Sequence, residues 1–189
     1  MTDSDEALLV ALQGGELSAF RELYGRHKDA MLRIAIRILT NRSDAEDAVQ
    51  DAFFSLFRRA DRFQGRSAFT TWLYRIVVNA CLKIRNERRG TETLSEGMEP
   101  AGVESSDPSG GIETRESARL VDRAILSLPL QQRIAFTLVA VEGVSRVEAA
   151  GIMGIDAGTV RYHLFAAREG LRKRLRPLLE GKEETDDAV

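Results

Sequence analysis

The sequence predicts an all-α protein made of two helical domains joined by a flexible acidic linker, with a helix-turn-helix in the C-terminal domain. Apolar residues recur at intervals of three and four in both halves of the 189-residue chain, which is the period of an amphipathic helix. No long alternation bounded by hairpin turns occurs. Residues 91–116 lack the helical period and contain Pro100, Pro108 and several glycines and serines, as linkers do. The predicted divisions are therefore 1–90, 91–116, 117–178 and an acidic tail over 179–189.

The first long helix is predicted from the apolar face that Phe20, Leu23, Tyr24, Met31 and Ile38 share, and it ends near residue 41. His27 lies on or beside that face. A histidine in such a place is usually a hydrogen-bonded residue at the edge of a core, so we assign it no chemistry.

The second helix opens at Ser43-Asp44-Ala45-Glu46, which predicts a capping box between Ser43 and Glu46. Its predicted buried stripe is Ala45, Ala48, Val49, Ala52, Phe53, Leu56 and Phe57. That stripe leaves Asp47, Gln50, Asp51 and Phe54 on other faces. Phe54 is then an apolar ring away from the stripe, which indicates either a second intramolecular contact or a docking surface, with equal weight.

The third helix is predicted to start within 67–71, to run through Ile84 and to end at 88–90. Near its start, aromatic residues alternate with cations: Phe63, Phe69, Trp72 and Tyr74 among Arg62, Arg66 and Arg75. Stacking rings beside positive charges are typical of a single-stranded nucleic-acid site. The alternative is that the rings are core anchors, which is the favoured interpretation for Trp72 taken alone.

The second half contains a helix over 120–128 that Pro129 stops, followed by a largely buried helix over 134–141 that ends at Gly143. Ser145 is then predicted to cap a short helix over 146–153, Gly154 to make a turn, and Asp156 to cap a long basic helix over 159–176. This order is the helix-turn-helix layout, whose second helix enters the major groove of DNA. The expected apolar contacts between the helices are Val147, Ala150, Ile155, Val160 and Leu164.

The formal net charge of −2 conceals a segregation of charge along the chain. Residues 72–89 carry five basic residues against one acid, and residues 159–176 carry six against one. Residues 91–116 carry seven acids against one base, and residues 177–189 carry five against one. Each basic run alone is equally well explained as a solvated helix face, but two of them together favour a polyanionic partner.

Several classes of function lack support in the sequence. Cys81 is the single cysteine, so neither an internal disulfide nor a cysteine zinc cluster is expected. Neither GxxxxGK[ST] nor GxGxxG occurs, and no histidine has a nucleophile in a catalytic pattern. We therefore expect no enzyme activity, no cofactor and no metal. The longest uncharged apolar stretch has eight residues and the N-terminus is acidic, so we expect a cytoplasmic protein without a membrane span.

The motifs resemble those of extracytoplasmic-function (ECF) sigma factors, the smallest class of the bacterial σ70 family. The resemblance covers residues 19–89 and 128–174. It rests on DAEDAVQDAFFSLF (44–57), FQGRSAFTTWLYRIVVNAC (63–81) and, in the second half, LPLQQRIAFTL followed by EGVSRVEAAGIMGIDAGTVRYHLFAAREGLRKRL. These motifs stand in the family's order and separation, and together they are highly specific.

The resemblance implies roles for individual residues. The first domain would be sigma region 2, which binds the β′ clamp helices of core RNA polymerase through Asp47, Gln50, Asp51 and Phe54. The same domain would open the −10 promoter element with Gln64, Arg66, Ser67, Phe69, Trp72, Arg75 and Asn79. Asn79 would help to hold an extruded base, for which its amide offers both a donor and an acceptor.

The second domain would be sigma region 4, which contacts the β flap of the polymerase and reads the −35 element. The matching positions are Arg146, Thr159, Arg161, Tyr162, His163, Phe165, Arg168 and Arg172. Tyr162, His163 and Ala166 depart from what many relatives carry there, so the −35 sequence cannot be transferred. The family also implies an anti-sigma factor as a partner.

Two hypotheses follow from the sequence. The first is a non-catalytic promoter-specificity subunit that melts DNA with binding energy and not with ATP. The second is a stand-alone transcriptional regulator, in which the helix-turn-helix binds DNA and the N-terminal bundle dimerises or senses a ligand. An enzyme fused to a DNA module is a third possibility that lacks a catalytic constellation.

Overall fold

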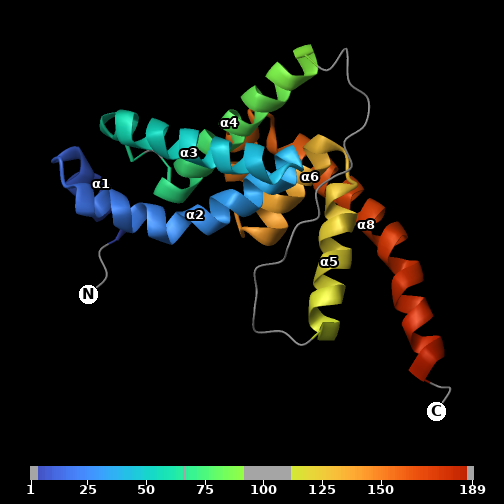
Figure 1. The fold of residues 1–189 in the computed structure, drawn as a ribbon. Helices are drawn as coiled ribbons and strands as arrows, with labels where there is room; N and C mark the ends of the chain where they lie inside the picture. The colour runs from blue at the N-terminus through green and yellow to red at the C-terminus, as the bar shows by residue number, and fades with distance from the viewer. Residues whose placement is uncertain (1–3, 66, 92–111, 187–189) are drawn as a thin grey trace.

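The computed structural model describes residues 4–65, 67–91 and 112–186 (Figure 1). Its elements are α1 (Asp5–Gln13), α2 (Leu17–Leu39), α3 (Arg42–Arg59), the 3-10 turn η1 (Ala60–Arg62), α4 (Phe69–Thr91), α5 (Ile112–Leu126), α6 (Leu130–Phe136), the π-helical turn η3 (Thr137–Val141), α7 (Arg146–Met153) and α8 (Ala157–Asp186). The described residues contain no strand, so the all-α prediction is confirmed. Most of the predicted linker lies outside the described residues, and α5 begins within the linker's last five.

Helices α1 to α4 form a bundle in which α2, α3 and α4 all pack on one another (Figure 1). The helices associate because each has one continuous apolar stripe. The largest fully buried side chains of this bundle are Leu9, Leu23, Met31, Ile34, Ile38, Leu56, Phe69, Leu73, Val77 and Val78. Burying a side chain of this size stabilises the fold by about 1.5–3 kcal/mol.

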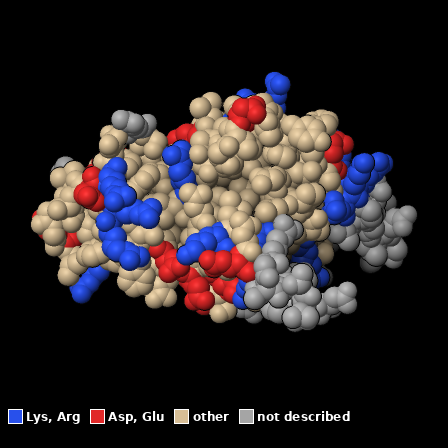
Figure 2. Space-filling view, turned by 90° about the horizontal axis from the view of Figure 1, so that it is seen from above, with Lys and Arg blue, Asp and Glu red and all other residues tan. Residues whose placement is uncertain are grey.

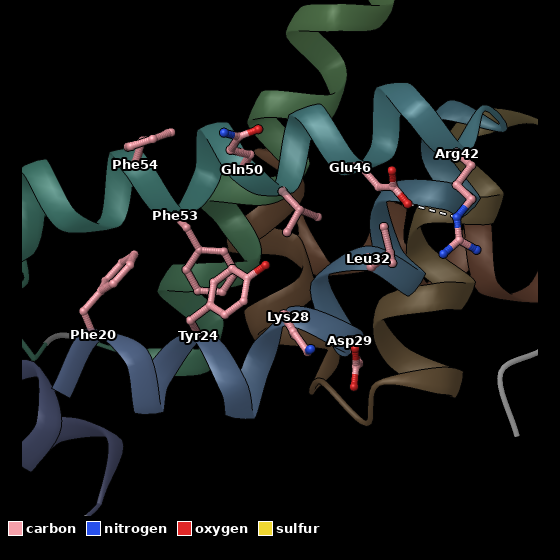
Figure 3. Close-up of a pocket in the computed structure, with 11 residues that line it drawn as sticks. Phe20, Tyr24, Lys28, Asp29, Leu32, Arg42, Glu46, Gln50, Phe53 and Phe54 are labelled. Atoms are coloured by element: carbon pink, nitrogen blue, oxygen red, sulfur yellow. Dashed lines mark hydrogen bonds and ion pairs between the residues drawn. The ribbon is translucent and has the colours of Figure 1, made fainter. Parts of the chain in front are cut away.

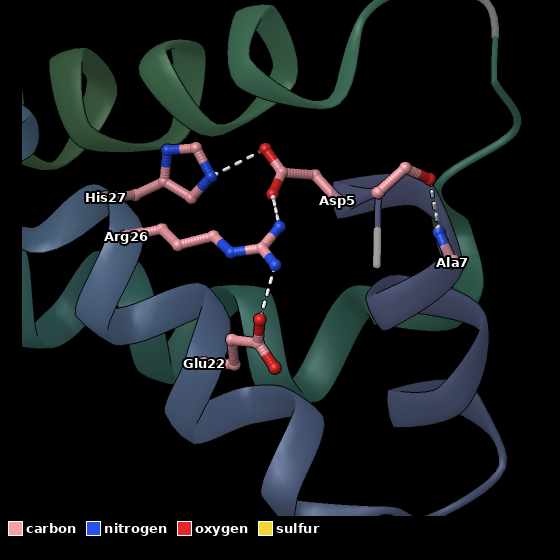
Figure 4. A network of polar contacts seen from close by, with 6 residues as sticks. Asp5, Ala7, Glu22, Arg26 and His27 are labelled. Atoms are coloured by element: carbon pink, nitrogen blue, oxygen red, sulfur yellow. Dashed lines mark hydrogen bonds and ion pairs between the residues drawn. The ribbon is translucent and has the colours of Figure 1, made fainter. Parts of the chain in front are cut away.

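Helix α1 was not predicted from the sequence. Ser4 caps it, because its Oγ accepts a hydrogen bond from the Ala7 N–H at 3.2 Å. The Asp5 carboxylate fastens α1 to α2: it accepts a hydrogen bond from Arg26 at 2.9 Å and lies 2.7 Å from Nε2 of His27 (Figure 4). The prediction for His27 is confirmed, because its side chain is hydrogen-bonded and the residue is only 9% exposed.

The structure corrects two predictions about α3. Asn41, and not Ser43, is the N-cap, because the helix already begins at Arg42 and Asn41 Oδ1 accepts the Asp44 N–H at 3.1 Å. Glu46 pairs instead with Arg42, 2.9 Å away and one turn back. Phe57 is 46% exposed: it sits in the last turn of α3, where its ring meets that of Phe20 edge to face, with 5.6 Å between centroids.

The helix predicted over 134–141 starts earlier and changes its winding. Pro129 occupies the N-cap position of α6, where its missing N–H costs nothing. After Phe136 the chain widens into the π-helical turn η3. Ile134 and Leu138 remain fully buried across this change, so the predicted burial of the segment is confirmed.

The two halves of the chain pack directly on each other. Helix α7 contacts α4, and α6 contacts α2. One buried apolar cluster contains core residues of α2 and α4 together with Ile134, Leu138, Val144, Ala149 and Ile152. A second, smaller cluster joins α5 to α8 through Ile125, Leu128, Ala167 and Leu171. The sequence divides the chain into two modules but gives no sign of this contact between them.

We predict that the Cys81 thiol is inert in the folded chain. The residue is fully buried, and burial raises the pKa of its thiol to about 12, so almost no reactive thiolate is present at pH 8. A chromogenic disulfide reagent should react with Cys81 only when urea unfolds the chain, at the rate of unfolding. Fast, complete labelling of the native chain would contradict the burial.

Candidate nucleic-acid and protein interfaces

The residues between the buried positions of α3 form an exposed face. Asp47, Gln50, Asp51 and Phe54 are all exposed, while Ala48 and Ala52 between them are fully buried. The Phe54 side chain is 53% exposed. Of the two interpretations left open for Phe54, the structure therefore favours a docking surface, because an intramolecular contact would have covered the ring.

This face borders a groove of about 650 Å³ between α2 and α3 (Figure 3). Aromatic rings form its wall, and charged or amide side chains form its rim. The lining residues are Phe20, Tyr24, Lys28, Asp29, Leu32, Arg42, Glu46, Val49, Gln50, Phe53 and Phe54. The apolar period of the sequence predicts Tyr24 on the buried face, but the residue is 43% exposed. An aromatic wall with a polar rim suits an amphipathic helix of another protein.

The loop before α4 holds the predicted aromatic cluster. Phe69 is only 1% exposed and packs on Phe63 and Trp72, with ring centroids 6.1 Å and 6.2 Å away. Phe69 is therefore a core anchor that supports the loop from inside, and its predicted direct contact with DNA is wrong for this conformation. Gln64 and Ser67 are exposed, and Arg66 lies outside the described residues.

The remaining −10 positions share one face of α4. At about 100° per residue, Trp72, Arg75 and Asn79 fall within an arc of about 60°. Arg75 and Asn79 are exposed, whereas Trp72 is partly buried against Phe63, 5.3 Å between centroids. A partly buried ring next to an exposed amide and a cation can stack on a base, bind its edge and contact a phosphate.

The predicted helix-turn-helix is confirmed in α7 and α8. Ser145 and Glu148 form a capping box: Ser145 Oγ accepts the Glu148 N–H, and Glu148 Oε2 accepts the Ser145 N–H, both at 3.2 Å. These hydrogen bonds lower the pKa of Glu148. Gly154 makes the turn with φ of +68°, and Asp156 accepts the Thr159 N–H at 2.9 Å.

The apolar contacts predicted between α7 and α8 are confirmed with one exception. Ala150, Val160 and Leu164 are buried and Ile155 is partly buried, but Val147 is 74% exposed. The reason is that α7 is short and buries Ala149, Ala150 and Ile152, which turns Val147 to solvent.

Helix α8 presents the predicted −35 positions on its solvent side. Those that are exposed are Arg161, Tyr162, Phe165, Arg168 and Arg172, and Arg146 of α7 is exposed as well. Thr159 is partly buried, and its hydroxyl donates to Asp156. His163 is also partly buried, and its ring lies 5.7 Å from that of Tyr162. Thr159 thus takes part in the cap of α8, whereas Nδ1 of His163 is buried without a hydrogen-bond partner.

The described residues contain no group of three or more histidine, cysteine or acidic side chains placed to hold a metal ion. None of the helices described is long and apolar enough to cross a bilayer.

Figure 2 shows basic side chains in several separate groups with acidic ones beside some of them. On this face of the molecule, contacts with a polyanion would therefore be local.

Both halves of the chain match models of known protein families. Residues 23–90 match the model of Sigma-70 region 2, and residues 118–171 match the model of Sigma-70, region 4. The ECF RNA polymerase sigma-E factor of Escherichia coli K12 is 35% identical over 185 residues, which cover 93% of this chain and 96% of that protein.

Solved structures show the same fold. CnrH, in complex with the cytosolic domain of CnrY, superposes with a TM-score of 0.68 at 26% identity, over 93% of this chain and 99% of that one. The sigma factor RpoE from Bartonella quintana, in complex with the anti-sigma factor NepR, has a TM-score of 0.71 at 24% identity, over 83% and 96%. The chain belongs to the sigma-70 family, within its extracytoplasmic-function group of RNA polymerase sigma factors.

Proposed function

We propose that this sigma factor divides its work among three surfaces. The α3 face and the adjoining groove bind core RNA polymerase, the face of α4 with Trp72 and Asn79 opens the −10 element, and the exposed side of α8 reads the −35 element. One observation carries the proposal. Most of the described motif residues that the family uses for contacts are exposed, with Phe69, Trp72, Thr159 and His163 as the exceptions, while the apolar residues between them are buried.

The polymerase surface combines one apolar anchor with polar neighbours. Phe54 supplies an exposed ring, Gln50 a two-way hydrogen-bonding amide, and Asp47 and Asp51 negative charge. An exposed aromatic ring surrounded by polar groups is the composition of a binding hot spot. The groove beside it gives a partner helix room to insert apolar side chains.

Promoter opening requires favourable binding free energy that offsets the cost of unstacking each base. Trp72 offers a ring at the protein surface, and Asn79 offers a donor and an acceptor seven residues along the same face of α4. Base stacking on an aromatic side chain contributes about 1–3 kcal/mol. Binding energy of this kind drives melting without ATP, so we propose that the chain has no catalytic activity of its own and uses no cofactor.

Recognition of the −35 element combines polar and apolar readout on α8. Arg161 can bond bidentately to a guanine edge, and Phe165 can contact a thymine methyl group. Arg168 and Arg172 lie farther along the helix and suit phosphates. Because Ala166 donates no hydrogen bond, the sequence preference follows from Arg161, Tyr162 and Phe165.

The cellular setting follows from the partners. A sigma factor acts where core polymerase and the chromosome are, so we propose that this chain works in the bacterial cytoplasm and is nucleoid-associated when bound to polymerase. Two solved relatives are in complexes with CnrY and with the anti-sigma factor NepR. We propose an anti-sigma partner for this chain too. The match of residues 23–90 to region 2 favours the sigma factor over the stand-alone regulator.

The proposal is tested by transcription of fragmented genomic DNA with core polymerase, with and without this chain, followed by mapping of RNA 5′ ends. We expect new starts that share two upstream elements. Core polymerase alone is the control for starts that do not depend on the chain. If no new starts appear while the C-terminal half still binds DNA, the stand-alone regulator is the correct hypothesis.

We predict that Phe54→Ala weakens binding to core polymerase by about 2 kcal/mol, or about thirtyfold in Kd, because it removes the apolar anchor. Fluorescence anisotropy of the labelled chain titrated with core polymerase measures the change. Val10→Ala on α1 is the matched control, because Val10 is 66% exposed and lies on another face. Equal affinities for both variants would remove Phe54 from the polymerase surface.

We predict that Arg161→Ala and Arg172→Ala affect promoters differently. Losing Arg161 should relax preference at one −35 position by about 1–3 kcal/mol. Losing Arg172 should weaken all promoters alike and lower the salt dependence of binding by about one charge. Transcription from a library of −35 variants separates the two effects, with Arg119→Ala, exposed on α5, as the control. A uniform effect of Arg161→Ala would argue against base readout.

A further inference from the structure

Helix α1 is packed on the bundle but supplies no residue to the three proposed surfaces. It contacts α2 and the turn η1, and its Leu8, Leu9 and Leu12 are at most 5% exposed. The match to Sigma-70 region 2 begins only at residue 23, after α1. Burial of three leucines holds α1 in place, so the helix can fix the position of the groups that it contacts.

Asp5, at the start of α1, is linked to Phe69 through His27. Oδ2 of Asp5 lies 2.7 Å from Nε2 of His27 (Figure 4). An ionised carboxylate only accepts hydrogen bonds, so Nε2 is the donor. The ring of His27 in turn lies 5.6 Å from that of Phe69 between centroids, and the two residues are 9% and 1% exposed. Because close packing leaves such rings little freedom, the Asp5–His27 pair limits where Phe69, the first residue of α4, can lie.

Gln13, at the end of α1, makes a second contact with the same part of the bundle. Its Nε2 donates to the Ala60 carbonyl at 2.7 Å. That carbonyl also accepts the Phe63 N–H at 3.2 Å, the hydrogen bond that closes η1. A carbonyl oxygen has two lone pairs and can accept both hydrogen bonds. Helix α1 therefore contacts the chain just before residue 63 directly, and residue 69 through His27.

The loop over residues 63–68 lies between these two contacts and carries predicted −10 positions. Its exposed residues are Gln64, Gly65, Ser67 and Ala68. Phe63 instead packs on Phe69 and Trp72, with ring centroids 6.1 Å and 5.3 Å away. Phe69 also lies 6.2 Å from Trp72, the ring that we propose for base stacking. The positions of the loop and of Trp72 therefore depend on the two ends of the loop, which α1 holds.

We propose that α1 positions the 63–68 loop and Trp72 for promoter opening, with Asp5, Gln13 and His27 as positioning residues. This inference rests on the proposed function. The three residues act through Ala60 and Phe69 and need no contact with DNA. A site that receives an unpaired base loses binding free energy when its groups are displaced by about 1 Å. Loss of either contact of α1 should therefore impair opening while the α3 surface is unchanged.

The fluorescence of Trp72 tests this positioning without any partner, because it is the single tryptophan of the chain. For Asp5→Leu we expect the acrylamide quenching constant of the free full-length chain to rise about twofold, because a less constrained loop exposes the indole. Asp5→Asn should restore the wild-type value, since its amide oxygen still accepts from His27.

Two control variants separate the His27 contact from other roles of Asp5. Glu6→Leu removes the other acidic residue in the first turn of α1, and Glu6 is exposed. Arg26→Gln removes the hydrogen bond to the second oxygen of Asp5, which is 2.9 Å long. Both controls should quench like the wild type. Quenching of Asp5→Leu equal to that of the wild type or of Glu6→Leu would overturn the proposal.

Promoter opening by the full chain with core polymerase tests the consequence. A promoter found by mapping of RNA 5′ ends carries a fluorescent purine analogue in its −10 element, which reports unstacking. We expect an opening equilibrium constant about tenfold lower for Asp5→Leu and for Gln13→Ala, each of which loses one hydrogen bond. Asp5→Asn should restore opening, and Val10→Ala, exposed on the same helix, is the control for Gln13→Ala.

Affinity for core polymerase, measured by anisotropy on the same variants, separates positioning from a general loss of structure. We expect it to stay at the wild-type value, because the α3 surface does not touch the changed residues. Equal losses of polymerase binding and opening would overturn the proposal, as would normal opening by both Asp5→Leu and Gln13→Ala. If the wild type itself opens no promoter, the proposed function fails, while the quenching of Trp72 still decides whether α1 positions the loop.

Discussion

Burial of one apolar stripe per helix is the constraint on which the rest of the structure depends. In α3 the stripe of Ala45, Ala48, Ala52 and Leu56 sets how the helix is rotated about its axis. Once that rotation is set, the residues between the stripe positions must face solvent. The exposure of the α3 face that we propose for polymerase binding is therefore a direct result of core packing.

Burial of an apolar stripe also orients the helices of the C-terminal half, where local capping hydrogen bonds contribute as well. The Ser145–Glu148 capping box determines where α7 begins, the left-handed Gly154 where it ends, and the Asp156 cap where α8 begins. Val160, Leu164, Ala167 and Leu171 then bury one side of α8, which leaves its arginines outward. Local hydrogen bonds set the helix boundaries, and burial sets which side chains can reach DNA.

Glu148 connects these local signals to the whole molecule. Its carboxylate caps α7 through Ser145 and also accepts the Thr71 hydroxyl of α4. One side chain thus stabilises the helix-turn-helix and joins it to region 2. Its depressed pKa means that both contributions are present at neutral pH and are lost as the pH falls through that pKa. The same carboxylate therefore caps α7 and makes the contact with α4.

The sequence by itself determined the all-α class, the caps of α7 and α8, and the exposure of Asp47, Gln50 and Arg161, because these depend on spacing and on neighbours within one helix. The tertiary structure decided what spacing cannot encode. The burial of Phe69, the exposure of Phe57 and Val147, the anchoring of α1 by Asp5, and the packing of α7 on α4 all depend on partners distant in sequence. Amphipathic periodicity shows that a face is buried, but not which element buries it.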